Sequence, residues 1–489
     1  MVSRAVPKPP PLYYRSPWKK ITQYELVAAG VLAVSSFTAL AIANIPLLAP
    51  YFHALRTLPI TVSLGPLHIA MPLQQWVNDV LMCSFFFMVG LQIKYELLAG
   101  RLRSPRAAAL PILGAFGGMI VPILTFVVVN KFFAGNEDPT RMTGWAIPMS
   151  TDIAFAAGCM SLLRRRVPPG LYVFLITLAI VDDLGAVAVI GVMHLESLRL
   201  AWFVPGLGII VLAWMIGRAG IQSATFFLAL GGMVWACFVM SGIHATVAGV
   251  LMAIAIPMRS QCLAEDFLDR TGQLLQSFRD AGRTSETELV NNQEQVVVRS
   301  LVRECFYVES ALQRILYGLE PFCSLVVLPV FAFVNSGLTF DWANMSDLLR
   351  QPVTIGVLLG LLFGKQLGIT LFCWISSLLG AAQLPEGVKL RQLWALSWLG
   401  GIGFTMALFL SELAYTSSAM HEIPITVGPE MPVAALAHTP VYEEDSALAT
   451  HNEEAKTGIF LASGMSAGIG LALLLLLCPR VEENGAPPV

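Results

Sequence analysis

The sequence predicts an all-α polytopic membrane protein with about twelve transmembrane helices, on the basis of its composition and its apolar runs. Hydrophobic residues make up 56% of the 489 residues and charged residues only 13%. Soluble domains carry about 25% charged residues. Apolar runs of about 20 residues, the length that crosses a bilayer, recur along most of the chain. A membrane β-barrel would instead show alternating segments of about ten residues.

Hydropathy places the spans at 23–48, 75–99, 107–130, 143–163, 169–195, 199–217, 222–240, 243–258, 311–338, 352–379, 391–416 and 456–478. Only VMSGIHAT separates the seventh span from the eighth. The fourth and eleventh spans carry helix-breaking or capping residues in mid-span, in AIPMSTDIAF and SWLGGIGFTMALF. Broken helices at membrane depth are tolerated where they line a cavity. Their corresponding positions predict inverted-topology repeats, spans 3–5 and 10–12, with a binding site where the breaks meet.

Lys and Arg residues alternate between the two sides of these spans. They concentrate in the N-terminal segment, in the loops after the second and fourth spans, and in the insertion after the eighth. Because basic loops face the cytoplasm, both termini are predicted to be cytoplasmic. The predicted order is a cytoplasmic N-terminal segment (1–22), helices 1–8 (23–258) with a hairpin at about 52–70, a cytoplasmic insertion (259–310), helices 9–11 (311–416), an acidic periplasmic loop (417–455), helix 12 (456–478) and a cytoplasmic tail (479–489).

Several further features limit the function. Residues 59–70 (PITVSLGPLHIA) alternate apolar side chains around Gly-Pro, which predicts a short β-hairpin or an irregular loop. The 259–308 and 417–455 stretches lack apolar periodicity and are long for structured loops, so they are expected to be mobile. A net charge of −2 argues against nucleic-acid partners. The eight cysteines have no zinc-ligand spacing and are expected to be buried thiols.

Four ionisable residues lie in the middle of otherwise apolar spans. Asp182 and Asp183 interrupt AIVDDLGAVAVIGV in the fifth span, Asp152 follows Thr151 in the fourth, and Lys365 lies in GLLFGKQLGITLF of the tenth. Each mid-membrane charge costs about 2.5–3.5 kcal/mol on insertion scales. That cost falls if the groups meet one another or water, so they predict one buried cluster. Asp152 and Thr151 as a helix cap, and Lys365 as a capping or interfacial residue, are the structural alternatives.

These motifs together resemble the bacterial NhaA-type sodium/proton antiporters. The resemblance rests on TDIAFA, LAIVDDLGA, SGIHATVAGV, LPVFAFVNSGL, GKQLGITLFCW, GGIGFTMALFL and FFFMVGLQIKYELLAGRL, and covers residues 20–258 and 310–416. NhaA is one of the transporters on which the inverted-repeat rule is based, so the rule adds no independent support. The resemblance implies an NhaA-like fold of twelve helices in which the broken fourth and eleventh helices cross.

The resemblance also implies the activity and the roles of the site residues. Asp183 would be the principal ion-binding carboxylate, with Asp182 beside it and paired with Lys365 in one state; Thr151 and Asp152 would lie next to the ion. Na⁺ or Li⁺ would be exported in electrogenic exchange for protons, for pH and sodium homeostasis, by a protein of the bacterial inner membrane. No cofactor is implied, the surroundings are membrane lipid, and the hairpin at 59–70 would form a homodimer contact.

A charge argument supports the exchange chemistry. Carboxylates buried together cannot all stay ionised without a cation, so protons and a hard cation such as Na⁺ compete for them. One site with mutually exclusive ligands, opened alternately to each side, is an antiporter. His244 and Glu96 are candidates for a response to pH, whereas Gln92 and Leu316 stand where the family commonly has acidic residues. His244 as a helix-end or packing residue is the alternative.

Other function classes remain open at the level of sequence. Asp152 and Asp183 could form the pair of an intramembrane aspartyl protease, but the chain lacks a Gly-x-Gly-Asp motif. A sodium-coupled symporter of similar build needs a second substrate pocket, and a relative that has lost transport would not need the aspartate pair or Lys365. His421, His438 and His451 are expected to be ordinary solvated residues of the outer loop.

Overall fold

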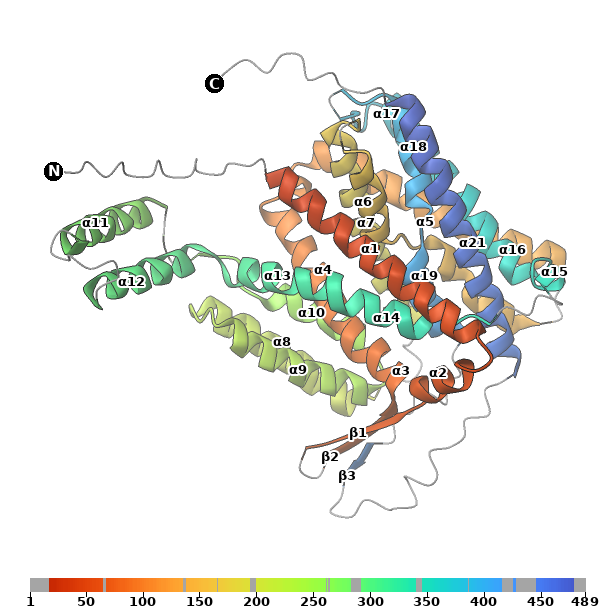
Figure 1. Cartoon of the computed structure of the whole chain (residues 1–489), viewed down its shortest axis with the longest axis horizontal. Coiled ribbons are helices and arrows are strands. Elements are labelled where there is room, and N and C mark those ends of the chain that lie inside the picture. The colour runs from red at the N-terminus through yellow and green to blue at the C-terminus, as the bar shows by residue number, and fades with distance from the viewer. Residues whose placement is uncertain are drawn as a thin grey trace.

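The computed structural model describes residues 17–64, 67–134, 138–164, 166–193, 199–260, 262, 264–282, 292–339, 345–385, 387–415, 425–427 and 446–478. Most of these residues form helices that run between two ends of one bundle (Figure 1). At one end α1 (Pro17–Asn44) begins and α21 (Ser446–Leu477) finishes, and we call this end the terminal face. The opposite end carries a small sheet and is called the sheet face.

The spanning elements follow the predicted order. After α1, the second span consists of α3 (Leu73–Trp76), η1 (Val77–Leu81) and α4 (Met82–Leu98), the third is α5 (Pro105–Ala134), and the fourth is η3 (Pro139–Met149) with α6 (Ile153–Leu162). The fifth to eighth are α7 (Pro169–Met193), α8 (Leu200–Arg218), α9 (Ala224–Ser241) and α10 (Ala245–Ala255). The ninth is α13 (Ala311–Phe322) with η5 (Cys323–Val327) and α14 (Leu328–Asn335), the tenth is α16 (Pro352–Leu359) with η6 (Gly360–Gly364) and α17 (Lys365–Leu378), the eleventh is α18 (Leu390–Gly400) with α19 (Phe404–Tyr415), and the last is α21. Short helices η2 (Arg101–Arg103), α2 (Ala49–Arg56) and α15 (Met345–Leu348) lie between spans.

The described residues bear out the polytopic α-helical class. Nine of their helical segments are long and apolar enough to cross a membrane, and the bent pair α18–α19 makes a tenth. The shorter apolar helices α6 and α10 occupy the positions of the fourth and eighth spans. The seventh and eighth spans divide where Gly242 ends α9 in a left-handed conformation (φ 83°) and His244 caps α10.

The segment predicted as a hairpin forms two antiparallel strands on the sheet face. β1 (Pro59–Leu64) pairs with β2 (Leu67–Pro72), with Ile60 opposite Met71. A third strand, β3 (Ile425–Val427), comes from the 417–455 loop and pairs with β2, with Ile69 opposite Ile425. Sequence reasoning missed β3, whose three β-branched residues favour a strand. The rest of that loop up to residue 445 lies outside the described residues.

The insertion after the eighth span contains two helices with apolar residues at helical spacing, so the interpretation that it lacks apolar periodicity was wrong for these residues. α11 (Ala264–Gly282) and α12 (Asn292–Val308) extend beyond the bundle (Figure 1). Their half-buried apolar residues repeat at helical spacing: Phe267, Leu274 and Phe278 on α11, and Val297, Leu301 and Val308 on α12. The two amphipathic helices pack on each other because this spacing places those residues on one face.

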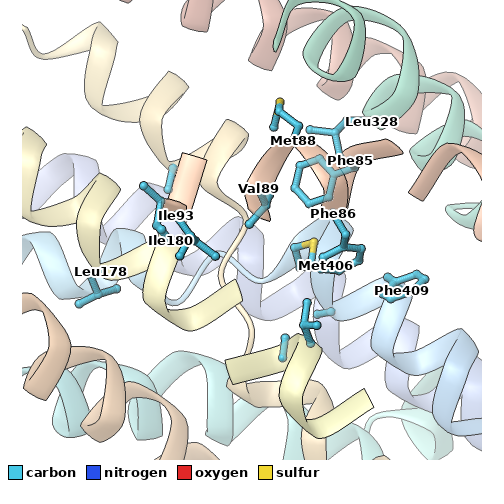
Figure 2. Close-up of a cluster of buried hydrophobic side chains, with 14 of the residues drawn as sticks. Phe85, Phe86, Met88, Val89, Ile93, Leu178, Ile180, Leu328, Met406 and Phe409 are labelled. Atoms are coloured by element: carbon cyan, nitrogen blue, oxygen red, sulfur yellow. The ribbon is translucent and has the colours of Figure 1, made fainter. Parts of the chain in front are cut away.

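A hydrophobic core fills the bundle around the broken helices. Figure 2 shows Phe86 of α4 next to Met406 of α19, and Phe85 of α4 next to Leu328 of α14. The rings of Phe86 and Phe409 are 5.5 Å apart. This packing joins the second span to α19, the helix that follows the break in the eleventh span, and so helps to hold that helix in place.

Candidate ion-binding site

The fourth span is broken at its centre, where a side chain and the eleventh span supply hydrogen-bond partners for backbone N–H groups. η3 ends at Met149, Ser150 and Asp152 are extended, and α6 begins at Ile153. The Asp152 carboxylate accepts a hydrogen bond of 2.9 Å from the Phe155 N–H and so caps α6. The capping role that sequence reasoning held as an alternative for Asp152 is therefore present, and it forms part of a larger arrangement.

The eleventh span breaks at the same level. α18 and α19 differ in direction by 47°, and Gly401 lies in the break. A Cβ atom at Gly401 would come within 2.6 Å of the Leu361 carbonyl oxygen, so only glycine fits there. The two breaks touch each other, since the Asp152 N–H donates to the Ile402 carbonyl over 2.7 Å and the Thr151 hydroxyl lies 3.0 Å from the Gly400 carbonyl.

Asp152 faces the beginnings of two helices. Besides capping α6, its Oδ2 accepts hydrogen bonds from the Thr405 N–H at 3.0 Å and from the Thr405 hydroxyl at 2.5 Å, at the first turn of α19. Both helix N-termini carry positive partial charge, which a carboxylate offsets. Sequence reasoning missed Thr405, although its position directly after the GGIGF break is the signal that marks it.

Lys365 lies against the C-terminal end of η3, which carries negative partial charge. Its Nζ donates to the Met149 carbonyl at the end of η3 over 2.5 Å and to Asp182 Oδ2 over 2.6 Å. The Lys365 side chain is 0% exposed, so the interfacial alternative for it is wrong, whereas a capping contact is present at the end of η3. A buried lysine between a carboxylate and a helix C-terminus has both its charge and its donors matched.

Asp182 and Asp183 have different surroundings. Asp182 Oδ2 contacts Lys365 and also lies 2.6 Å from the Thr151 hydroxyl. Asp183 is 1% exposed, and neither of its carboxylate oxygens has a hydrogen-bond partner within the described part of the chain. Neighbours on a helix point about 100° apart, which explains why only one of them reaches Lys365. Asp183 therefore offers two unsatisfied buried oxygens.

The lysine is held in place by a close crossing of α5 and α17. A Cβ atom added at Gly368 would lie 2.0 Å from the Gly117 carbonyl oxygen. These two glycines therefore let the helix backbones touch one turn after Lys365. The π-helical turn η6 comes directly before Lys365, and such turns are frequent at functional sites.

A cavity of about 320 Å³ reaches α6 from the terminal-face half of the bundle. Its lining brings together Glu96, Gln92 and Leu316, the positions at which the sequence keeps or departs from the family pattern. It also contains Glu25 and Glu320, which sequence reasoning missed although both are charges in apolar spans. Ile153 and Ala154, which follow Asp152, belong to the same lining.

His244 lies elsewhere. It is buried, its Nδ1 lies 2.9 Å from the Thr246 hydroxyl at the start of α10, and its Nε2 is 3.7 Å from Asp79 Oδ1. Among the described residues the lining of the cavity includes Glu96 and not His244. The structure therefore separates the two residues that the sequence grouped as candidates for a response to pH. Asp79, a half-buried acid facing His244, was also missed.

One prediction about the outer histidines was wrong. His451 is 5% exposed rather than solvated, because it lies in the first turns of α21 between two carboxylates. The sequence could not indicate this, since Asp138 is more than 300 residues away. His421 and His438 lie outside the described residues.

Comparison with known proteins decides the family. The Na⁺/H⁺ antiporter 1 family matches residues 19–474. The chain belongs to that family. It is 39% identical to the Na⁺/H⁺ antiporter NhaA 1 of Saccharophagus degradans over 402 residues, which cover 82% of this chain and 85% of that one. It is also 35% identical to NhaA 2 of Syntrophotalea carbinolica, over 94% of this chain and 97% of the relative.

NhaA-type membership establishes the activity at the level of the ions. The protein is a Na⁺/H⁺ antiporter, a secondary transporter rather than an enzyme, and the protease and symporter alternatives fall away. Of the solved structures, the sodium proton antiporter MjNhaP1 from Methanocaldococcus jannaschii matches with a TM-score of 0.44 and 13% identity, over 93% of this chain and 99% of that one. That likeness is too distant to support any argument about the site.

Proposed function

We propose that this antiporter binds Na⁺ or Li⁺ at Asp183, Asp182 and Thr151, and releases protons as it does so. The observation that carries the proposal is the Asp183 carboxylate, which is buried without a hydrogen-bond partner among the described residues. An isolated buried carboxylate is stable when it is protonated or bound to a cation. Hard cations prefer oxygen ligands, which the carboxylates, the Thr151 hydroxyl and nearby carbonyls supply.

Lys365 compensates the charge of Asp182 during the transport cycle. In this arrangement Asp182 is paired with Lys365, so only Asp183 needs a proton when no cation is present. A cation that recruits Asp182 has to displace Lys365, which then gives up a proton or its ion pair. Loss of more than one proton for each Na⁺ makes the exchange electrogenic. The membrane potential then adds to the driving force for Na⁺ export, which serves pH and sodium homeostasis.

The proposal includes an orientation and an assembly. The terminal face is cytoplasmic, in line with the basic loops on that side, and the protein is multi-pass in a bacterial inner membrane. The hairpin of β1 and β2 forms the contact of a homodimer, where β1 is the free edge strand because β3 covers the other edge. The mass of the purified protein with and without residues 59–70, measured by light scattering, tests the dimer.

The exchange itself is tested by dissipation of ΔpH in inverted membrane vesicles on addition of Na⁺, Li⁺ or K⁺. We expect the wild-type protein to respond to Na⁺ and Li⁺, and Asp183→Asn to abolish the response while folded protein remains in the membrane. Asp347→Asn is a matched control, since Asp347 is exposed on α15. Retained Na⁺-driven proton movement in Asp183→Asn would overturn the assignment of Asp183.

A further inference from the structure

A second group of ionisable residues lies on the sheet face, apart from the ion site. His451 Nε2 is 2.8 Å from Asp138 Oδ2, and His451 Nδ1 is 3.1 Å from Glu454 Oε2. A neutral imidazole has one donor nitrogen and one acceptor nitrogen, whereas the imidazolium has two donors. Because both nitrogens face carboxylates, this geometry fits the protonated ring. We call His451, Asp138 and Glu454 the histidine clamp.

The histidine clamp fastens the outer end of η3. Asp138 caps this element by accepting a hydrogen bond of 3.0 Å from the Thr140 N–H. Hydrogen bonds from Thr140 and then from His451 lower the pKa of Asp138 from 3.8 to about 2, so it stays ionised. The Tyr415 hydroxyl donates to the Arg141 carbonyl over 2.9 Å, which ties α19 to the same end.

The other end of η3 belongs to the ion site. Met149, its last residue, contacts Lys365, and the next two residues lead to Thr151, which contacts Asp182. η3 has 11 residues, and a 3₁₀ helix rises about 2 Å per residue, so the clamp and the site lie at the two ends of one rod of about 20 Å. A change in how the clamp holds η3 therefore reaches the site through a single element.

On the sheet face, buried polar contacts between α19 and α21 lie around η3. Glu412 and Lys456 form an ion pair of 2.5 Å and are both buried, and Asn452 donates to Glu412 over 3.3 Å. The cavity next to α6, in contrast, lies in the terminal-face half. We expect opening towards the sheet face to move the outer end of η3 relative to α19 and α21, and the histidine clamp joins η3 to α21 across that boundary.

We propose that His451 is a positioning residue whose imidazolium, held by Asp138 and Glu454, keeps the outer end of η3 docked on α21 and makes exchange sensitive to the pH on the sheet face. Acid on that side keeps the ring charged and the clamp intact. Alkali removes one of the two donors, leaves a carboxylate facing a lone pair, and weakens the closed state. Only the identification of that side as the periplasm rests on the proposed orientation.

Other charged groups around the histidine clamp are already matched. The described titratable or charged residues near it are Arg141 on η3, Glu412 and Tyr415 on α19, and Lys456 and the exposed Glu453 on α21. Arg141 lies 3.6 Å from Asp138, and Lys456 is paired with Glu412. On α16, the group at this level is the Thr354 hydroxyl, which donates to the Glu454 carbonyl over 3.0 Å. His451 is therefore the group at the clamp whose charge changes near neutral pH.

The test measures exchange of radioactive Na⁺ for Na⁺ in sided vesicles, so that no net proton movement drives transport. The pH on the terminal face is held constant, and the pH on the sheet face is stepped from about 6 to about 8, where histidine titrates. The variants are His451→Gln and Asp138→Asn. His53→Gln is the matched control, since His53 is exposed on α2 at the same face.

We expect His451→Gln and Asp138→Asn to raise exchange at acidic sheet-face pH by about threefold and to flatten the profile there, the size expected for loss of one interhelical contact in a membrane. The KM for Na⁺ at the terminal face should stay within about twofold, because the site residues are unchanged. Competition between protons and Na⁺ at the ion site should be the same in the wild type and in every variant. His53→Gln should show the same pH profile as the wild type.

Two results would overturn the proposal. One is a sheet-face pH profile that is the same in His451→Gln, Asp138→Asn and the wild type. The other is a fall in exchange at every pH with an unchanged profile, since a residue with only a structural role would act in that way. If His451→Gln fails to reach the membrane, Asp138→Asn and Glu454→Gln supply the same comparison.

Discussion

At the scale of single residues, two of the buried charges in the site, Asp152 and Lys365, are matched to helix ends. Asp152 faces the N-termini of α6 and α19, and Lys365 faces the C-terminus of η3. Asp182 completes the ion pair with Lys365, which leaves Asp183 as the carboxylate without a partner in the described residues. The burial of Asp152 and Lys365 is therefore offset by partial charges that exist only because the helices are broken.

Thr405 tests this matching. Thr405→Val keeps the shape of the side chain and removes the hydroxyl that donates to Asp152. We expect the free energy of unfolding to fall by about 1 kcal/mol, the size of a net hydrogen bond, and Na⁺ affinity to fall with it. Thr405→Ser retains the donor and should behave like the wild type. Equal thermal stability of the two variants in detergent would contradict the role of this hydrogen bond.

Asp138 gives a stability effect with a defined dependence on pH. Its pKa of about 2 lies below its ordinary value of 3.8, so its contribution is complete above about pH 4 and is lost as the pH falls towards 2. We expect Asp138→Asn to lower the thermal midpoint near neutral pH. The loss in free energy of unfolding should be less than about 1 kcal/mol, because the carboxylate is partly solvated. The difference from the wild type should shrink between pH 4 and pH 2; a difference that is constant with pH would refute this account.

At the scale of elements, the position of the lysine depends on how closely two helices approach. α5 and α17 cross through Gly117 and Gly368, and the break of the eleventh span packs Gly401 against Leu361. Small residues permit such contacts in membranes, where helix association depends on close packing and not on the hydrophobic effect. The broken helices themselves are joined by the backbone hydrogen bond from the Asp152 N–H to the Ile402 carbonyl.

Gly368→Ala should separate α5 from α17. The added Cβ would lie 2.0 Å from the Gly117 carbonyl, so the helices have to shift, and overpacking of this kind costs about 1–3 kcal/mol. Lys365, one turn away, would move relative to Asp182, and we expect a large loss of exchange in vesicles. Gly208→Ala on α8 meets no atom within 4 Å and is the matched control. Normal exchange by Gly368→Ala would show that this crossing does not position Lys365.

At the scale of the whole molecule, the chain brings its own topology reporter. Of the eight cysteines, Cys305 on α12 is exposed and the others are buried or partly buried. If the terminal face is cytoplasmic, a membrane-impermeant maleimide should label Cys305 in inverted vesicles and not in intact cells. Cys305→Ser should remove that labelling. Labelling of Cys305 from outside the cell would reverse the proposed orientation.

The sequence predicted most of the ion site because intramembrane charges are costly. Asp182, Asp183, Asp152 and Lys365 stood out in apolar runs, and the structure brings Lys365 to Asp182 and Asp152 to the broken helices. The partners that the sequence missed are ordinary residues in other elements. Thr405, the Met149 carbonyl and the Gly400 carbonyl lie beside the two breaks, but they become ligands or caps only where the two repeats cross.

Composition and periodicity by themselves determined the membrane class, the order of the spans, the breaks in the fourth and eleventh helices and the presence of a buried charged cluster, because the bilayer imposes length and polarity on every segment. Only the tertiary structure decided that His451 lies between two carboxylates, that β3 extends the hairpin, and that Glu96 and His244 belong to different places. These are contacts between residues far apart in the chain, and they depend on how the helices pack, which no local pattern contains.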